Sequence, residues 1–241
     1  VSQIDPLEER DLIYGNFSNY GFEARWLSHY NLFGKKVIFL IGNKWYSAQN
    51  DSGQGAGNDS SDPDFMFYND KFPDYPYQSF YQYPNKNLAF FSEHIFYLSN
   101  KLSATPGVRY ELIDTRSEGY YRKINFDAAG NVIQDQTIDE NQNNKRSFFL
   151  LGLGVNYKLN KNIEIYINAS QNYRSVTFAD ISIFNPAYSI DPNIKDEDRI
   201  TSDIVIRGTI KHYLSYDTNL FYLDYNDRIG FTQKVYQDGR V

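Results

Sequence analysis

Apolar and polar residues alternate along several long stretches of this chain. In the stretch 163–170, every second residue is apolar: Ile163, Ile165, Ile167 and Ala169. The same alternation runs through 103–112 and 202–211. Successive side chains of a β-strand point to opposite faces of the sheet, so this period of two predicts strands with one apolar and one mostly polar face. A shift of one residue would exchange the two faces, so the register is strongly specified.

Eight such stretches are present, and they are long. We expect strands at 18–30, 36–48, 86–98, 101–113, 147–158, 162–174, 200–212 and 216–226. Each would have about 11 to 13 residues, whereas strands of globular proteins most often have about 5–6. A tilted strand needs about 9–11 residues to cross a bilayer, so these lengths are typical of membrane-spanning strands.

The connections between the expected strands alternate between short and long. Tight turns rich in Asn, Lys, Gly or Asp are expected at 31–36, 98–101, 158–162 and 212–217. Long polar insertions are expected at 49–85, 114–146 and 175–199. Outer-membrane β-barrels have short periplasmic turns and longer extracellular loops. The pattern therefore predicts an all-β, antiparallel transmembrane barrel segment of about eight strands.

The composition agrees with this fold class. Aromatic residues make up 17% of the chain and charged residues 22%, and the mean hydropathy is −0.60. Disordered segments lack aromatic residues, and no run of about 18 apolar residues predicts a membrane helix. Aromatic residues are also good strand formers, but near strand ends they fit the girdles at the two membrane interfaces. Those near expected strand ends are Trp26, Tyr30, Trp45, Tyr46, Tyr97, Tyr110, Tyr157, Tyr173, Tyr213, Tyr216 and Tyr225.

Charge and motifs exclude several classes of function. The net charge of −6 and a pI of about 5.1 argue against nucleic-acid binding, which needs a concentrated basic patch. The chain has no Cys and only three histidines, His29, His94 and His212, without the spacing of a zinc site. Nucleophile-elbow, phosphate-loop and dinucleotide motifs are absent. We therefore expect no enzyme activity, no cofactor and no metal site.

Three further segments have expectations of their own. Residues 1–15 contain no basic segment followed by an apolar core, so no export signal is expected there. The acidic stretch 51–64 lacks the regular spacing of a calcium loop and is expected to be a flexible surface loop. Residues 64–85 place many rings between prolines, which fits a ligand-facing platform or a structured loop packed on its neighbours.

Residues 86–114, KNLAFFSEHIFYLSNKLSATPGVRYELID, resemble the recurrent hairpin of TonB-dependent outer-membrane receptors. Residues 161–181 are similar to the strand that precedes a variable loop in those receptors. Residues 191–210 resemble the acidic approach to the next strand, and 218–230 the strand after it. In arrangement the chain most resembles the ferric-citrate branch of siderophore receptors. The resemblance covers about 86–230 well and the first 85 residues loosely.

The resemblance implies a barrel of 22 strands, closed by a plug domain and energised through TonB, which imports a ferric chelate across the Gram-negative outer membrane. We expect residues 1–241 to form one β-barrel segment of such a receptor, with the plug domain absent from this chain. The implied partners are a ferric chelate, such as a siderophore or ferric citrate, or another small nutrient, TonB acting through the plug, and outer-membrane lipid. A complete eight-stranded barrel acting as an adhesin or enzyme is an alternative; its two chain ends would lie on adjacent strands.

Import of an iron chelate requires groups that recognise anions, and the guanidinium fork of arginine matches carboxylate-like oxygens. Five arginines are expected at or beside extracellular strand ends: Arg116, Arg122, Arg146, Arg174 and Arg199. Each is alternatively a rim charge paired with a nearby carboxylate. Arg174 with its neighbour Tyr173 is best placed, because its strand leads directly into a long insertion. Arg109, Glu111 and Arg207 are expected to form salt bridges of the barrel wall or contacts to the plug.

A second class of function also fits the aromatic loops, namely a soluble or surface-attached β-sandwich that binds carbohydrate. The two hypotheses differ in where the apolar faces point. In a barrel wall they face lipid from a single sheet, whereas in a sandwich they lie between two sheets about 10 Å apart.

Overall fold

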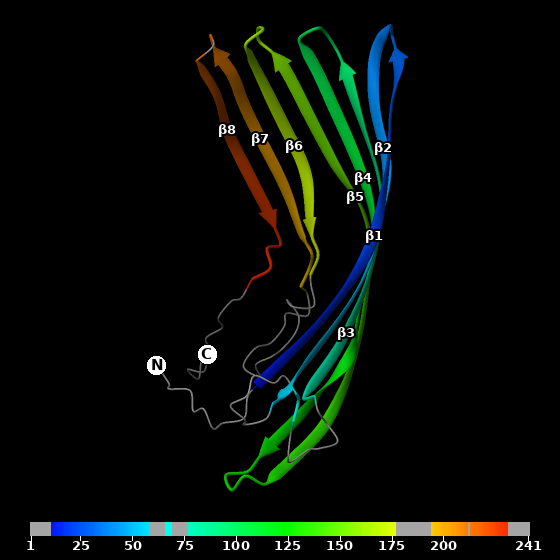
Figure 1. Cartoon of the computed structure of the whole chain (residues 1–241), viewed down its shortest axis with the longest axis vertical. Helices are drawn as coiled ribbons and strands as arrows, with labels where there is room; N and C mark the ends of the chain where they lie inside the picture. Colours follow the sequence, from blue (N-terminus) through cyan, green and yellow to red (C-terminus); the bar gives the residue numbers. More distant parts are fainter. Residues whose placement is uncertain (1–10, 58–65, 69–76, 177–193, 212, 231–241) are drawn as a thin grey trace. The chain divides into compact units, whose positions relative to one another are not determined.

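A computed structural model describes residues 11–57, 66–68, 77–176, 194–211 and 213–230. They form one eight-stranded sheet in which each strand pairs with the next along the chain (Figure 1). The strands are β1 (Asp11–Leu32), β2 (Lys35–Ala56), β3 (Ser79–Tyr97), β4 (Leu102–Phe126), β5 (Val132–Lys158), β6 (Ile163–Arg174), β7 (Glu197–Ile210) and β8 (Leu214–Asn226). Within this part of the chain, no helix has the length and apolar character needed to cross a membrane.

The sheet divides into two compact units, and each is described by itself. Unit 1 comprises 1–23, 44–88 and 112–147, and unit 2 comprises 24–43, 89–111 and 148–241. Unit 2 contains the four short turns between β1 and β2, β3 and β4, β5 and β6, and β7 and β8. The first three predicted tight turns are confirmed. The fourth, predicted at 212–217, is displaced, since β7 ends at Ile210 and β8 already begins at Leu214. The first consists of Phe33 and Gly34 alone, both with positive φ.

The predicted strands are confirmed, but the predicted lengths are wrong for β1 to β5. These five strands have 22, 22, 19, 25 and 27 residues. The insertion predicted at 114–146 is instead the far half of the β4–β5 hairpin, with only 127–131 between the strands. The insertion predicted at 49–85 is shortened at both ends, since β2 continues to Ala56 and β3 begins at Ser79. Residues 51–56 are thus strand and not surface loop, while 58–64 lie outside the described residues.

The turn between β4 and β5 shows why this segment pairs. The Asp127 carboxylate accepts hydrogen bonds from the backbone N–H groups of Ala129 and Asn131, at 2.9 and 2.8 Å, and from the Asn131 amide at 2.9 Å. Gly130 adopts a φ of 84°, which a glycine tolerates without steric cost. These bonds lower the pKa of the Asp127 carboxyl below its ordinary value. The closed turn sets β4 beside β5, and backbone pairing then continues whatever side chains follow.

The apolar faces predicted for β6 and β7 lie on the same side of the sheet. Ile165 pairs with Ile206, and Ile167 pairs with Ile204, which in turn lies opposite Leu220 of β8. Ile204 is 43% exposed and Leu220 is 72% exposed. Among the described residues there is one sheet and no second layer over this face, so the two-sheet sandwich is wrong.

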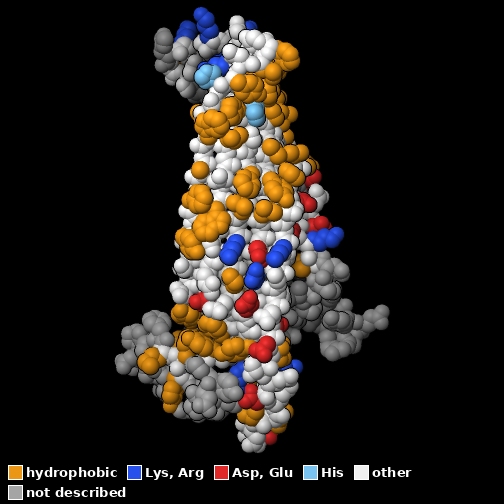
Figure 2. All heavy atoms as spheres, turned by 90° about the vertical axis from the view of Figure 1, so that its right-hand side faces the viewer, with side chains coloured by type: hydrophobic (Ala, Val, Ile, Leu, Met, Phe, Trp, Pro, Cys, Tyr) orange, Lys and Arg blue, Asp and Glu red, His pale blue; other side chains and the backbone are white. Residues whose placement is uncertain are grey.

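The described residues contain almost no conventional core. Only Val37, Ala48 and Ala89 are buried hydrophobic residues, whereas many large apolar side chains are exposed. Figure 2 shows such side chains gathered on one face. A water-soluble domain of this size would bury them, whereas a sheet in a bilayer turns them to hydrocarbon while its backbone groups pair internally.

Candidate ligand-recognition site

The face of β6, β7 and β8 opposite the apolar one carries polar side chains that bond across the strands. Arg207 forms a salt bridge with Glu164 at 2.6 Å, which confirms the wall salt bridge predicted for Arg207. Further along, Asn168 donates to Asp203 at 3.1 Å and Asn172 donates to Thr201 at 2.8 Å. Arg109 likewise bonds to Glu111 within β4. This polar face is typical of a barrel lumen.

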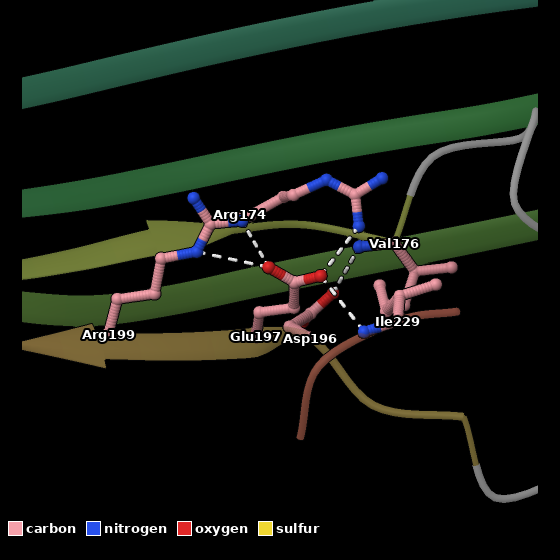
Figure 3. Close-up of polar contacts among 6 residues, drawn as sticks. All are labelled: Arg174, Val176, Asp196, Glu197, Arg199 and Ile229. Carbon is pink, nitrogen blue, oxygen red and sulfur yellow. Dashed lines mark hydrogen bonds and ion pairs between the residues drawn. The ribbon is translucent and has the colours of Figure 1, made fainter. Parts of the chain in front are cut away.

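The polar face ends in a cluster built around the carboxylate of Glu197 (Figure 3). Glu197 is the first residue of β7 and is only 3% exposed. It accepts hydrogen bonds from Arg174 Nη1 at 3.0 Å, Arg199 Nε at 3.0 Å and the backbone N–H of Ile229 at 2.9 Å. We call Arg174, Val176, Asp196, Glu197, Arg199 and Ile229 the Glu197 cluster. It joins the end of β6, the start of β7 and the segment after β8.

The strand register explains why these residues meet. Arg174, the last residue of β6, pairs directly with Glu197, and Arg199 follows two residues later on the same face. Alternation places Tyr173 on the other face, opposite Asp198. The Tyr173 ring packs on Phe148 with centroids 4.0 Å apart, and its hydroxyl donates to Asp196. Asp196 also accepts the backbone N–H of Val176 at 2.7 Å.

A second aromatic residue extends the site toward β8. The Arg199 guanidinium lies 4.8 Å from the centroid of the Tyr225 ring, and that of Arg228 lies 5.9 Å from the same centroid. Cation–π contacts of this kind hold a guanidinium in a fixed orientation. The arrangement brings several cationic groups to the end of the polar face, where a single carboxylate bridges Arg174 and Arg199.

The other three candidate arginines belong to unit 1. They lie inside strands, so the prediction that they stand at strand ends is wrong. Arg122, with its side chain 2% exposed, donates from Nη2 to both carboxylate oxygens of Asp135, at 2.8 and 2.7 Å, across the β4–β5 hairpin. Arg116 pairs with Asp114 at 3.1 Å, and Arg146 donates to Thr115 at 3.3 Å. Arg122 and Arg146 thus bond across β4 and β5, whereas Arg116 bonds within β4. A role in ligand binding stays a prediction for all three, as it does for Arg174, Tyr173 and Arg199.

The remaining sequence candidates add no chemistry among the described residues. His94 bonds to Tyr30 at 3.3 Å and to Ser92 at 3.1 Å. In the described ranges no group of three or more His, Asp or Glu side chains is arranged to hold a metal ion. His212, most of the ring-rich stretch 64–85 and residues 177–193 of the third insertion lie outside the described residues. A hollow of about 780 Å³ beside the turns at 159–162 and 211–213 does not include the Glu197 cluster.

Sequence reasoning missed Glu197, Asp196, Tyr225 and Arg228. A signal was available in the run Lys195-Asp196-Glu197-Asp198-Arg199, since alternation along a strand places Glu197 and Arg199 on one face. The bond from the Ile229 backbone had no signal, because it depends on where the chain turns after β8.

A single antiparallel sheet with an open apolar face, a polar opposite face and short turns at one end defines the wall of an outer-membrane β-barrel. A family model described as TonB dependent receptor-like, beta-barrel, matches residues 5–240. The chain belongs to this family. Its members are non-enzymatic proteins of the Gram-negative outer membrane, so the predicted fold class, location and lack of catalysis are confirmed.

Solved structures show the same fold. The ferric yersiniabactin uptake receptor FyuA from Yersinia pestis has a TM-score of 0.64 at 14% identity, covering 90% of this chain and 30% of that one. The ferric citrate transporter FecA, in its unliganded form, has a TM-score of 0.67 at 15% identity, covering 92% and 30%. The ferric-catecholate import receptor Fiu from E. coli K12 has a TM-score of 0.68 at 12% identity, covering 94% and 33%.

The chain therefore spans about a third of the length of these receptors. No curated protein sequence matches it. At these identities the likeness concerns the fold, and the ligand must be argued from the site.

Proposed function

We propose that these strands belong to a receptor that imports an anionic ferric chelate, of the siderophore or ferric-citrate type, by TonB-energised transport. The observation that carries the proposal is the convergence of Arg174 and Arg199 on one buried carboxylate at the loop end of the polar face. Two guanidinium groups held at one carboxylate are already oriented to receive another anion.

The chemistry of the ligand class supports this choice. Ferric citrate and ferric siderophores present carboxylate, hydroxamate or catecholate oxygens, and guanidinium groups pair with such oxygens through two parallel hydrogen bonds. The polar face of β6, β7 and β8 leads from the Glu197 cluster along the barrel wall through bonded Asn, Asp and Thr side chains. The receptors similar in fold are named for yersiniabactin, citrate and catecholate chelates, which agrees with an iron chelate without selecting one.

Uptake of radioactive iron tests this function. The receptor that contains these strands would be produced in Gram-negative cells that lack their own chelate receptors, with ferric citrate and a ferric catecholate as probes. We expect uptake of at least one probe, and its loss both in cells without TonB and after dissipation of the proton gradient. Uptake of neither probe, or equal uptake without TonB, would contradict the proposal.

A double variant tests the site. Arg174→Gln with Arg199→Gln removes both guanidinium groups from the cluster, whereas Lys123→Gln with Lys145→Gln removes two positive charges from unit 1. Because hydrogen bonds to charged groups contribute about 1.5–3 kcal/mol each, we expect half-saturation of uptake to rise at least about tenfold in the first variant only. An equal rise in both variants would show that general charge, not this site, attracts the ligand.

A further inference from the structure

The four short turns of unit 2 share a composition that strand pairing alone does not require. They join consecutive strands at the upper end of the view in Figure 1. Segments 31–36, 98–101, 158–162 and 210–216 contain no Asp or Glu, although the whole chain carries a net charge of −6. Their lysines are all exposed, and they are Lys35, Lys36, Lys101, Lys158, Lys161 and Lys211.

Contacts between the turns show that these lysines form one continuous rim. The Lys35 ammonium donates to the carbonyl of Leu98, which joins the first turn to the second. The Lys101 ammonium donates to the carbonyl of Leu159 at 3.4 Å, which joins the second to the third. The backbone N–H of Thr209, beside the fourth turn, donates to the carbonyl of Asn162 in the third at 3.0 Å. We call the six lysines the lysine rim.

Each turn also exposes at least one large apolar side chain at its tip. Phe33 is 95% exposed, Tyr213 75%, Leu98 48% and Leu159 46%. The six ammonium groups are well solvated in bulk water, but the four apolar tips are not, because exposing apolar surface to water is unfavourable. At the boundary of a bilayer both groups are satisfied, since apolar tips enter the headgroup region while lysine ammonium groups reach the polar surface.

The backbone of the first turn gives independent support. Phe33 has a φ of 50° and Gly34 a φ of 74°. Two-residue hairpin turns with two positive φ values strongly favour Asn-Gly, and a bulky residue at the first position is a steric outlier. A Phe held in this conformation breaks the local rule, although its side chain is 95% exposed and so packs little on the described residues. Insertion of the Phe33 ring into lipid would remove it from water and so offset the strain of the positive φ.

Aromatic residues on the strands that lead into the turns show on which side of the membrane interface the rim lies. The Phe39 ring lies 5.6 Å from the Trp26 ring and stacks on His94 at 5.8 Å, between centroids. Trp and other rings of this kind are enriched at the level of the lipid headgroups. Trp26 lies six residues before the end of β1, so the lysine rim lies on the turn side of that level.

We propose that the lysine rim, together with its apolar tips, binds the phosphate groups of anionic phospholipids such as phosphatidylglycerol in the periplasmic leaflet of the outer membrane. Ammonium groups on flexible stems suit mobile phosphates that approach from several directions. An acidic protein segment would match the charges but not the four apolar tips. This inference concerns the membrane around the barrel and does not depend on the imported ligand.

Lipid retention tests the proposal. The whole receptor that contains these strands would be reconstituted in nanodiscs of phosphatidylethanolamine with phosphatidylglycerol, and the phospholipids that remain bound would be counted by native mass spectrometry. Each basic residue near an anionic lipid surface contributes about fivefold in binding at low salt, so we expect phosphatidylglycerol to be enriched at least about tenfold over its bulk fraction. Molar salt, which shortens the Debye length to about 3 Å, should abolish the enrichment.

Two variants and a control assign the effect to the rim. Replacing Lys36, Lys158, Lys161 and Lys211 by Gln leaves in place the two lysines that bond to turn carbonyls, and we expect it to bring the enrichment close to one. The control replaces the same number of exposed lysines elsewhere by Gln, namely Lys86, Lys123, Lys145 and Lys195. It should keep the enrichment of the unaltered protein.

Phe33→Asn separates lipid binding from folding. Asn suits a positive φ, so the turn itself should become no less stable in detergent, while retention of phosphatidylglycerol should fall. No enrichment in the unaltered receptor, or equal loss in the rim variant and the control, would overturn the proposal. Displacement of the lipid by soluble polyglutamate, combined with an unchanged Phe33→Asn variant, would also overturn it, because the rim would then be a surface for an acidic protein.

Discussion

Glu197 holds a buried carboxylate between two guanidinium groups and one backbone N–H. Because its partners come from β6, β7 and the segment after β8, a single side chain decides how three parts of unit 2 are joined. The same carboxylate orients Arg174 and Arg199 toward the loop end of the polar face. Its removal should therefore release the segment around Ile229 before it affects the sheet.

Amide hydrogen exchange of the receptor measures this release. In Glu197→Ala we expect the Ile229 amide to exchange roughly tenfold faster, because the loss of a hydrogen bond to a charged acceptor destabilises the closed state by more than 1 kcal/mol in typical cases. Asp198→Ala, at the exposed neighbouring position, should leave the Ile229 amide unchanged. Equal exchange at Ile229 in Glu197→Ala and the unaltered protein would mean that another group holds this segment.

Asp127 makes the β4–β5 turn sensitive to pH. Its pKa is lowered in the folded turn by the bonds from Asn131, Ala129 and Gly130. A lowered pKa means that the stabilisation is fully present above the ordinary aspartate value of about 3.9 and is lost as the pH falls through the folded value. We expect protection of the Asn131 amide to fall below about pH 4. Asp127→Asn should remove this pH dependence, and a turn that opens identically in both proteins would rule out Asp127 as its cause.

For single residues, the sequence predicts which types of side chain a site needs more readily than which side chains they bond to. Arg174 and Arg199 were predicted as ligand contacts because guanidinium groups match anionic oxygens and both residues were expected at strand ends beside a long insertion. Glu197 was missed, since in sequence it is one of several neighbouring carboxylates and only the register with β6 singles it out. Arg122 was predicted for the ligand, yet the hairpin places it against Asp135 because β4 continues past the predicted strand end.

Among the strands, β7 shows how one face meets lipid while the opposite face meets the polar lumen. Ile204 lies on the apolar face between Ile167 and Leu220, and its neighbour Val205 lies on the opposite face between Tyr166 and Asn219. Both are near the middle of the strand. A charge placed at these two positions therefore meets hydrocarbon in one case and a polar lumen in the other.

Unfolding of the receptor in lipid vesicles compares the two positions. We expect Ile204→Lys to lower the free energy of unfolding by about 2–4 kcal/mol, as found for lysine near the middle of the lipid face of a barrel. Val205→Lys should cost less than about 1 kcal/mol, since lumen positions tolerate polar side chains. Similar losses at both sites would place the two faces in the same medium and contradict the barrel wall.

The strands could be predicted where one face of the sheet meets lipid, because only there do apolar and polar residues alternate along the sequence. Residues 114–126 and 132–146 are polar on both sides, so alternation is lost even though the backbone pairs as well as before. The turn Asp127-Ala128-Ala129-Gly130-Asn131 is the signal that was overlooked, since a short Gly-containing loop between extended segments is typical of a hairpin.

For the whole molecule, the short turns and the β4–β5 turn lie at opposite ends of their strands. Outer-membrane barrels have their short turns on the periplasmic side, so we expect these turns in the periplasm. The chain has no cysteine, so single cysteines report on this orientation. We expect Ala129→Cys to react with a membrane-impermeant maleimide on intact cells, and Asn100→Cys to react only after permeabilisation. The receptor without either substitution controls for cysteines elsewhere, and reaction of Asn100→Cys on intact cells would reverse the orientation.

The family was recognisable from the hairpin at 86–114, where lipid-facing and lumen-facing residues alternate about a tight turn. The ligand was not recognisable, because the long connections between strands show no regular alternation from which their structure could be predicted. The proposal of an anionic ligand rests on the Glu197 cluster.

The far half of the β4–β5 hairpin has a practical use. From Asp114 to Phe126 its first strand is paired along about 40 Å, at about 3.3 Å per residue. Its tip is closed by hydrogen bonds within the turn, so we expect it to accept a short epitope grafted between Ala128 and Gly130. Antibodies added to living cells could then count the receptor without disturbing either the import site or the membrane.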